Sequence, residues 1–214
     1  MPFECLSCLE CCNRYWISVL PSELRREAKS LHLSEKSFTD KFCVLFLELY
    51  HGSFRSDALV VSSKNFPKKI SKKIKKELGV LPESFLALPF FSFRRKGRKC
   101  IFLKSKKCLI HEVKPMQCFL FPFIELEQKM KGKPLDELYP FCRGLGENLE
   151  TDVAFKALGE KHYNRVKVYF ESIKKKGFKK VWRHWPAKGV LALEGKVLCE
   201  LSGKDFFSLI SLFA

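Results

Sequence analysis

Four cysteines near the start of the chain constrain it more than any other feature of its sequence. They follow the pattern Cys5-x2-Cys8-x2-Cys11-Cys12. Two-residue spacers let a turning backbone direct successive thiolates at one centre, which both zinc knuckles and iron–sulfur loops require. Adjacent side chains usually diverge, so we expect that Cys11 and Cys12 do not serve the same metal in the same way. The pattern predicts a metal centre that includes the N-terminal segment.

The other cysteines divide into a remote set and two isolated residues. The remote set is Cys100, Cys108, Cys118 and Cys142. Four plus four thiolates could fill two four-ligand sites, or fill one site and leave some thiols free. Both zinc and an iron–sulfur cluster accept thiolate ligands, so the spacing leaves the metal open. Cys43 and Cys199 stand in apolar surroundings outside the motif, and we interpret both as structural.

The start of the chain and its apolar runs bear on where the protein works. Met1-Pro2-Phe3 has neither the basic head nor the apolar core of a signal peptide. No uncharged apolar run is long enough to cross a bilayer as a helix. We therefore expect a cytoplasmic protein, in which clustered cysteines bind metal or catalyse rather than form disulfides.

The cysteines belong to a longer set of segments that together resemble a known family. The segments are Cys100-Ile101-Phe102-Leu103, the stretch from Cys108 to Phe123, and Cys142-Arg143-Gly144-Leu145-Gly146. With the N-terminal motif they resemble the bacterial and archaeal cysteine-cluster family of zinc- or iron-chelating domains, over about residues 3 to 146. The resemblance implies that all eight motif cysteines bind metal, as zinc or as an iron–sulfur cluster.

The same resemblance raises an enzyme alternative. The family is related to flagellin lysine N-methylases, which implies a metal-dependent methyl or group transferase with S-adenosylmethionine as cofactor. Three positions depart from the family pattern: His111 replaces Tyr, and Lys114 and Phe119 each replace Arg. Lysine lacks the planar bidentate donor of arginine, so the departures weaken the enzyme alternative. We expect His111 to be a packed histidine rather than a ligand, and the catalytic residues and the methyl-donor site stay unknown.

Basic residues are concentrated in one part of the chain. The formal net charge is +17, and residues 64–107 hold 15 Lys and Arg against the two acids Glu77 and Glu83. This Lys64–Lys107 stretch predicts an RNA- or ribosome-associated module or an anionic surface partner, or else a solvated lysine face. Phe91 and Phe93 stand among its arginines, an interleaving typical of single-strand binders.

Local patterns predict an α+β fold of short helices and hairpins that is organised around metal rather than around a large sheet. We expect a cysteine-cluster domain over 1–148 and an extension over 149–214, with a helix and a hairpin. Expected helices cover 21–31, 34–42, 67–78 and 152–175, with a short one at the C-terminal end. Expected strands are 15–20, two joined by a turn at 44–50 and 58–61, and hairpins over 90–103 and 189–201. Trp182 and Trp185 are predicted core anchors of the extension.

Overall fold

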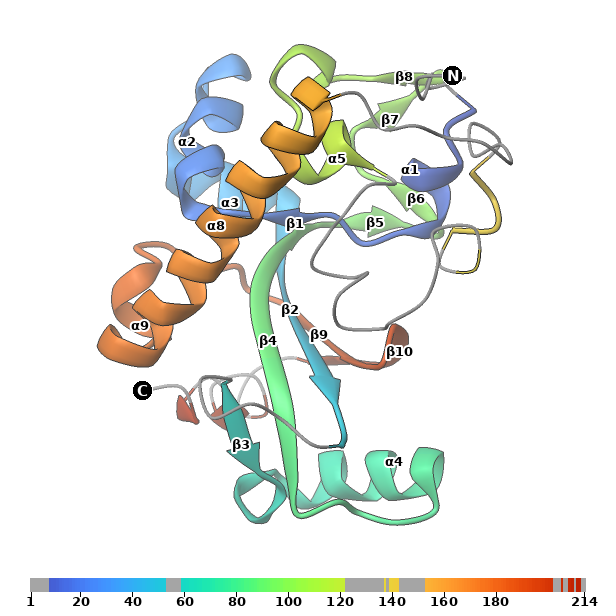
Figure 1. Ribbon diagram of the computed structural model, residues 1–214, viewed down its shortest axis with the longest axis vertical. Helices are drawn as coiled ribbons and strands as arrows, with labels where there is room; N and C mark the ends of the chain where they lie inside the picture. The colour runs from blue at the N-terminus through green and yellow to red at the C-terminus, as the bar shows by residue number, and fades with distance from the viewer. Residues whose placement is uncertain are drawn as a thin grey trace.

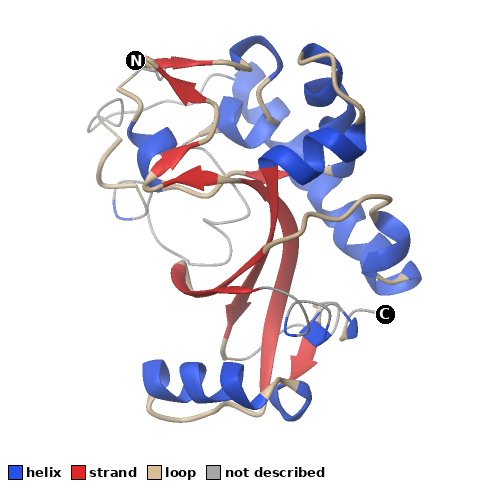
Figure 2. Cartoon of the chain, turned by 180° about the vertical axis from the view of Figure 1, so that it is seen from behind, coloured by secondary structure: helices blue, strands red, loops and turns tan. Residues whose placement is uncertain are grey.

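The computed structural model describes residues 8–52, 59–121, 137, 139–142, 153–201, 205, 208–209 and 211–212. These residues form an α+β fold, as the sequence predicts, in which helices pack on one six-stranded sheet and two small hairpins stand apart from it (Figures 1 and 2). The predicted C-terminal helix lies largely outside the described residues.

The first half of the chain supplies most of the sheet. Its elements are α1 (Glu10–Arg14), β1 (Ser18–Val19), α2 (Pro21–Ser30), α3 (Glu35–Phe42), β2 (Cys43–Tyr50), β3 (Val60–Ser62), η1 (Ser63–Asn65), α4 (Lys68–Leu78) and β4 (Ser84–Phe93). The helices begin where the sequence predicts, because Pro21 opens α2 and the Ser34 hydroxyl accepts a hydrogen bond from the Ser37 N–H at the start of α3.

The elements that follow carry the remote cysteines and the C-terminal segment. They are β5 (Arg95–Lys96), β6 (Lys99–Cys100), β7 (Leu103–Lys104), β8 (Lys107–Cys108), η2 (His111–Val113), α5 (Met116–Leu120), α8 (Val153–Lys176), α9 (Phe178–Val181), β9 (Gly189–Leu193) and β10 (Lys196–Leu201). Among the described residues, no helix combines the length and apolar character needed to span a membrane.

The sheet is larger than the sequence predicts, and β4 explains why. The strand order is β1-β4-β2-β9-β10, and β3 pairs with β4 as well. The predicted turn-linked strands at 44–50 and 58–61 do not pair with each other, since β2 and β3 both pair with β4. A continuous apolar run such as β4 can accept partners along both edges, and local patterns do not reveal which partners it takes.

The hairpin β9–β10 joins the sheet from the far end of the chain. It turns at Glu194-Gly195, as predicted, where both residues have positive φ. Strand β9 pairs in parallel with β2. The buried Trp182 stacks on Phe91 of β4, with ring centroids 3.7 Å apart. The division of the chain at residue 148 stays a prediction, and the hairpin beyond it shares its sheet with strands that precede it.

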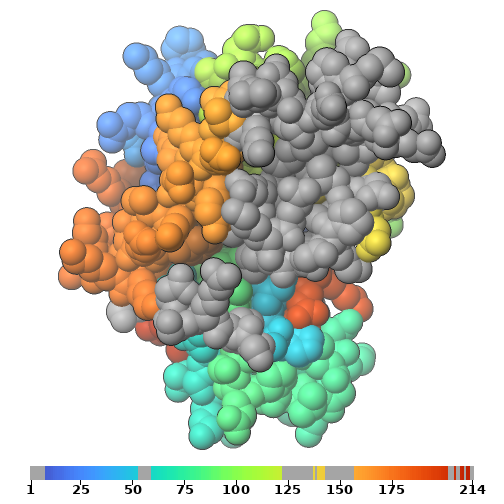
Figure 3. Space-filling model, viewed as in Figure 1, coloured from blue at the N-terminus to red at the C-terminus, as the bar shows by residue number. Residues whose placement is uncertain are grey.

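The basic helix α4 is amphipathic, and its apolar face is already used. Ile70 and Ile74 are buried in the main core together with Leu47 of β2 and Phe85 of β4. Most lysines of α4 are exposed to solvent, and Lys73 is half-buried. The helix forms the lower end of the molecule, far from the cysteine-bearing hairpins (Figures 1 and 3).

Candidate metal centre

The described motif cysteines come from separate short elements at one end of the molecule. Cys11 and Cys12 lie on α1, Cys100 ends β6, Cys108 ends β8 and Cys118 lies on α5. All of these elements gather at the upper end of the molecule (Figure 1). Cys8 immediately precedes α1, and Cys142 lies in the short segment 139–142. Cys5 lies outside the described residues.

Two consecutive hairpins of the same design carry Cys100 and Cys108. Residues 95–102 (RKGRKCIF) and 103–110 (LKSKKCLI) match position by position in residue type, with one exception at their first position. In each unit a two-residue turn joins two short strands, and the cysteine ends the second strand. The hydrogen bonds repeat too, because Ile101 N–H donates to Arg94 O and Leu109 N–H to Phe102 O, both at 2.9 Å. Sequence analysis missed this eight-residue repeat, which comparing the two segments would have revealed.

Each hairpin presents its cysteine sulfur to a backbone donor. The N–H of Phe102 donates to the sulfur of Cys100, and the N–H of Ile110 donates to the sulfur of Cys108. Burial raises the pKa of both thiols, and these donors oppose that effect because they favour the thiolate. Hydrogen bonds to sulfur are a usual feature of thiolate-bound metals.

Four thiols from four elements lie close enough to affect one another's ionisation. Burial raises the pKa of Cys118 well above its ordinary value, and Cys100, Cys11 and Cys108 raise it further. Cys108 and Cys11 likewise raise the pKa of Cys100. Neutral thiols are therefore favoured in this group, and a bound cation would reverse the preference because the metal ligand is the thiolate.

Cys11 and Cys12 do not diverge as expected. The Cys11 thiol shares a side-chain hydrogen bond with Cys12, which is the largest cause of its raised pKa, followed by burial. The turn of helix in α1 brings these neighbouring thiols together at the side of β6. Whether they serve the same metal stays a prediction.

Arg95 connects the first hairpin to α1. Its guanidinium donates to the carbonyl oxygens of Tyr15 and Asn13, the latter at 2.5 Å. These carbonyls stand at the C-terminal end of α1, where helical partners are lacking. Arg95 also pairs with Cys100 across the β5–β6 ladder. One side chain therefore holds the element with Cys11 next to the strand with Cys100.

Helix α5, which carries Cys118, is held by α2 and β1. The buried Glu23 carboxylate accepts from Leu20 N–H at 2.9 Å and from Met116 N–H at 2.8 Å, so it satisfies donors at the start of both helices. Gln117 accepts from both the N–H and the hydroxyl of Ser18. Sequence analysis missed Glu23, because nothing in the local pattern of α2 shows that a second helix begins beside it.

An aromatic cluster connects α1 to the segment that carries Cys142. The rings of Tyr15, Phe121 and Tyr139 lie within 5.3 Å of one another by their centroids. Cys11 and Cys142 both pack against this cluster. The structure therefore brings Cys142 toward the same region as the first motif.

The donor chemistry fits a thiophilic metal. Among the described residues, no group of three or more Cys, His, Asp or Glu side chains is already arranged to hold a metal ion. The thiols that influence one another are nevertheless all motif cysteines, with sulfur donors of the kind that zinc and iron–sulfur clusters take. The fold thus gathers suitable donors.

Two predicted features of the surroundings are wrong. His111 is exposed rather than packed, because η2 turns it away from the core. Phe91 and Phe93 are buried in the sheet and cannot stack on bases. Both lie in β4, most of which is buried, and Arg94 and Arg95 follow where that strand ends.

Two departures from the family pattern lie together. The Lys114 ammonium is 5.6 Å from the ring centroid of Phe119, a cation–π contact. Lys114 also lowers the pKa of Cys108, in opposition to burial, which is the larger effect. These positions therefore border the second hairpin, where the lysine favours the thiolate of Cys108.

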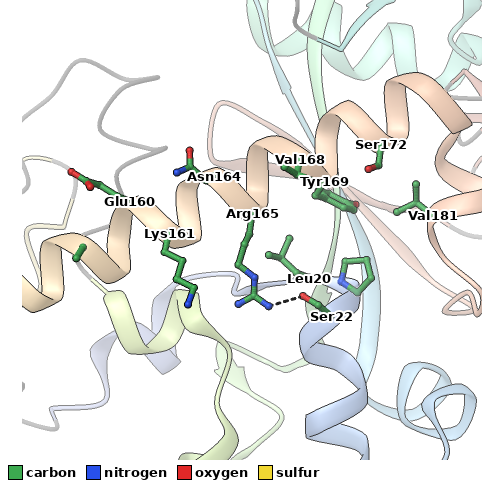
Figure 4. Close-up of a pocket in the computed structure, with 12 residues that line it drawn as sticks. Leu20, Ser22, Glu160, Lys161, Asn164, Arg165, Val168, Tyr169, Ser172 and Val181 are labelled. Atoms are coloured by element: carbon green, nitrogen blue, oxygen red, sulfur yellow. Dashed lines mark hydrogen bonds between the residues drawn. The ribbon is translucent and has the colours of Figure 1, made fainter.

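A pocket of about 660 Å³ lies between α8 and the start of α2. Lys161 and Arg165 extend from α8 toward Ser22, whose hydroxyl accepts from Arg165 at 3.1 Å (Figure 4). Leu20 and Tyr169 contribute apolar walls. No cysteine is found among the described residues that line this pocket, which sets it apart from the described motif cysteines.

Replacing Arg95 with lysine is expected to weaken metal retention while the protein stays folded. Lysine cannot donate to two carbonyls in the fork geometry of a guanidinium, so α1 and β6 should separate more easily. We expect a chelator to remove the metal about tenfold faster, a size typical of outer-shell changes. Stopped-flow chelation measures this rate. Arg98→Lys, at the exposed tip of the same hairpin, is the control, and equal rates for both variants would contradict the role of Arg95.

Comparison with known proteins yields one match. A model of the CxxCxxCC family, with the description "putative zinc- or iron-chelating domain", matches residues 4–143, which is more than half of the chain. Neither a curated protein nor a solved structure matches the chain.

Proposed function

Since the chain belongs to the CxxCxxCC family of zinc- or iron-chelating domains, we propose that its cysteines hold one or two zinc ions or iron–sulfur clusters that stabilise the fold. The proposed ligands are Cys5, Cys8, Cys11, Cys12, Cys100, Cys108, Cys118 and Cys142. Metal chelation is what the family description gives. Our proposal adds the identity of the metal and its role in stabilising the fold.

One observation carries the proposal. The thiols of Cys11, Cys100, Cys108 and Cys118 come from four separate elements, and each is close enough to others of the set to affect their ionisation. Buried free thiols pack as small hydrophobes and have no reason to gather from distant parts of a chain. Their convergence is what a shared metal requires.

The position of the ligands supports a structural role. The elements with the remote cysteines are very short, and hairpins of two-residue strands have little stability in isolation. A metal bound by α1, β6, β8 and α5 would fasten these elements to each other, and its binding free energy would add to that of folding. Such a centre would also supply Lewis acidity if the metal is zinc, or electron transfer if it is an iron–sulfur cluster.

A reducing, cytoplasmic location is part of the proposal. The nine described cysteines are all free of disulfides, and reduced thiols are the form that binds metal. Among the described residues, no motif cysteine lines the pocket between α2 and α8, so this pocket does not connect the metal centre to a methyl-donor site.

The test is anaerobic purification followed by elemental analysis and an absorption spectrum of one sample. Iron with sulfide and a broad band near about 400 nm would identify a cluster, whereas stoichiometric zinc in a colourless protein would identify a zinc centre. A folded protein that contains neither metal, with its motif thiols open to a thiol reagent, would refute the proposal.

A further inference from the structure

The two repeated hairpins present the same cations at the same places. In each unit the second, fourth and fifth positions are basic and exposed. These six residues, called the basic tips, are Lys96, Arg98, Lys99, Lys104, Lys106 and Lys107. Both hairpins point to the same side of the molecule (Figures 1 and 2). The repeat therefore sets cations at regular intervals along one surface.

The sequence of the two hairpins contains no acidic residue that would reduce the positive charge of this surface. Residues 94–111 contain no Asp or Glu, and no carboxylate among the described residues pairs with a basic tip. The lysines of α4 differ, because Glu77 lies on that helix and pairs with Lys196 at 2.5 Å, and Lys69 approaches Asp205 at 4.0 Å. Among the described residues, the basic tips thus have no compensating carboxylate.

The local backbone holds the tips in a defined place. Ser105 and Lys106 both have positive φ (48° and 60°), which side-chain-bearing residues rarely adopt. Such turns twist the strands of a two-residue hairpin correctly, but Asn-Gly is the sequence that forms them at least cost. A lysine kept at this strained position projects from the very end of the hairpin.

Two exposed aromatic rings each lie over or beside a cation whose own neighbours belong to a hairpin. Phe141 is 46 % exposed, and the Arg14 guanidinium lies 3.5 Å from its ring centroid. Arg14 belongs to α1, which contacts β6 of the first hairpin. Phe119 is also 46 % exposed, beside the Lys114 that acts on Cys108 of the second hairpin. Each ring keeps 46 % of its surface exposed beside the cation that lies over it, whereas Phe91 and Phe93 are buried.

We propose that the basic tips and these two rings form a binding surface for a single-stranded nucleic acid. The cations would follow the phosphates, and the rings would stack on bases that a single strand leaves free, a combination typical of sequence-tolerant single-strand binding. The turns of the hairpins, residues 96–99 and 104–107, hold only Lys, Arg, Gly and Ser, while the exposed apolar side chains near them are Leu109, Phe119 and Phe141. An anionic membrane is therefore the competing occupant that the vesicle comparison below must exclude. The buried face of α4 is closed to a membrane.

The test measures binding of a fluorescein-labelled 12-nucleotide RNA of mixed sequence to the full chain by anisotropy, over a range of salt. Six phosphate contacts predict that the logarithm of Kd rises with the logarithm of salt concentration with a slope of about 4. The variant K96Q/R98Q/K104Q/K106Q should bind at least about 30-fold more weakly at low salt, with a slope lower by about 3.

A matched variant separates the effect of the basic tips on RNA binding from the effect of positive charge elsewhere on the protein. K68Q/K72Q/K75Q/K76Q removes four cations from α4 and should change Kd less than about threefold. Equal losses in the two variants, or no binding by the unmodified protein at low salt, would overturn the proposal. Stronger binding of duplex RNA, or of phosphatidylserine vesicles in place of RNA, would overturn its single-strand assignment. If the quadruple tip variant does not fold, the pairs K96Q/R98Q and K104Q/K106Q each should show about half of the change in slope.

Metal content, measured on the same samples, keeps this inference distinct from the proposed function. The tip variant should retain full metal, so that lost binding reports the surface and not the centre. If the protein proves metal-free yet binds RNA through the tips, the surface stands and the metal proposal falls. If the metal is present and the tip variant binds RNA normally, the metal proposal stands and the binding surface falls.

Discussion

The Cys118→Ser variant is expected to lose its metal and to melt at a far lower temperature than the unmodified protein. Cys118 lies on α5 among three other motif thiols that affect its pKa. Serine has nearly the same size but is a poor ligand for a thiophilic metal, so the change removes a metal bond with little change in packing. Structural zinc contributes on the order of 10 kcal/mol in small domains, and losing part of this can abolish a marginal fold. Elemental analysis and a thermal melt check both effects.

Cys199→Ser is the matched control for this change. Cys199 lies on the edge strand β10, is partly exposed and stands outside the motif. Its replacement should leave metal content unchanged and shift the melting temperature by only a few degrees, as for most surface changes. Cys8→Ser should behave like Cys118→Ser if the N-terminal motif serves the same centre. Full metal and an unchanged melting temperature in the Cys118 variant would refute the structural role.

The second large effect concerns Glu27, a carboxyl that the sequence does not distinguish. Glu27 lies on α2 with 0 % of its surface exposed, and among the described residues neither of its oxygens has a hydrogen-bond partner. Burial, with a smaller contribution from the nearby Glu23 and against the opposing charge of Arg26, raises its pKa from 4.5 to about 8. The folded protein therefore binds this proton more tightly than the unfolded chain does.

The contribution of Glu27 to the stability of the unmodified protein should consequently fall as pH rises. Below pH 4.5, the pKa of this carboxyl in the unfolded chain, the group is neutral in both the folded and the unfolded state. Its titration then does not change the free energy of unfolding. Between pH 4.5 and about 8 the unfolded chain loses the proton first, so the free energy of unfolding falls. The contribution of this group over that window is at most about 5 kcal/mol.

Glu27→Gln should remove that dependence, because an amide does not titrate. Urea denaturation is expected to give nearly equal stabilities for the two proteins at pH 5, and a more stable variant at pH 8. The difference between the proteins cancels the pH effects of groups that Glu27 does not influence. Cys43 and Cys118, whose pKa values its charge raises, are part of the difference. Glu160→Gln, on the exposed surface of α8, should show no such difference. A variant that is less stable at pH 8 would mean that the Glu27 carboxylate has a stabilising partner when it is ionised.

Much of the local structure follows from the sequence because near neighbours determine it. The apolar period of α4, the proline at the start of α2 and the turn at Glu194-Gly195 each depend on residues within a few positions, and the structure confirms them. The family and its metal chelation likewise follow from the spacing of cysteines, since short spacers alone decide which thiolates can meet. Which cysteines bind the metal stays a prediction.

Tertiary structure decided what depends on distant partners. The pairing of β4 with three strands, the insertion of β9 beside β2 and the burial of Phe91 all require contacts between segments far apart in the chain. The same holds for the roles of Glu23 and Arg95, whose partners lie on other elements. A sequence pattern reports which face of an element is apolar. The free energy of the whole packed arrangement selects the surface that this face meets. That selection determines which charges are buried and which remain open to a partner.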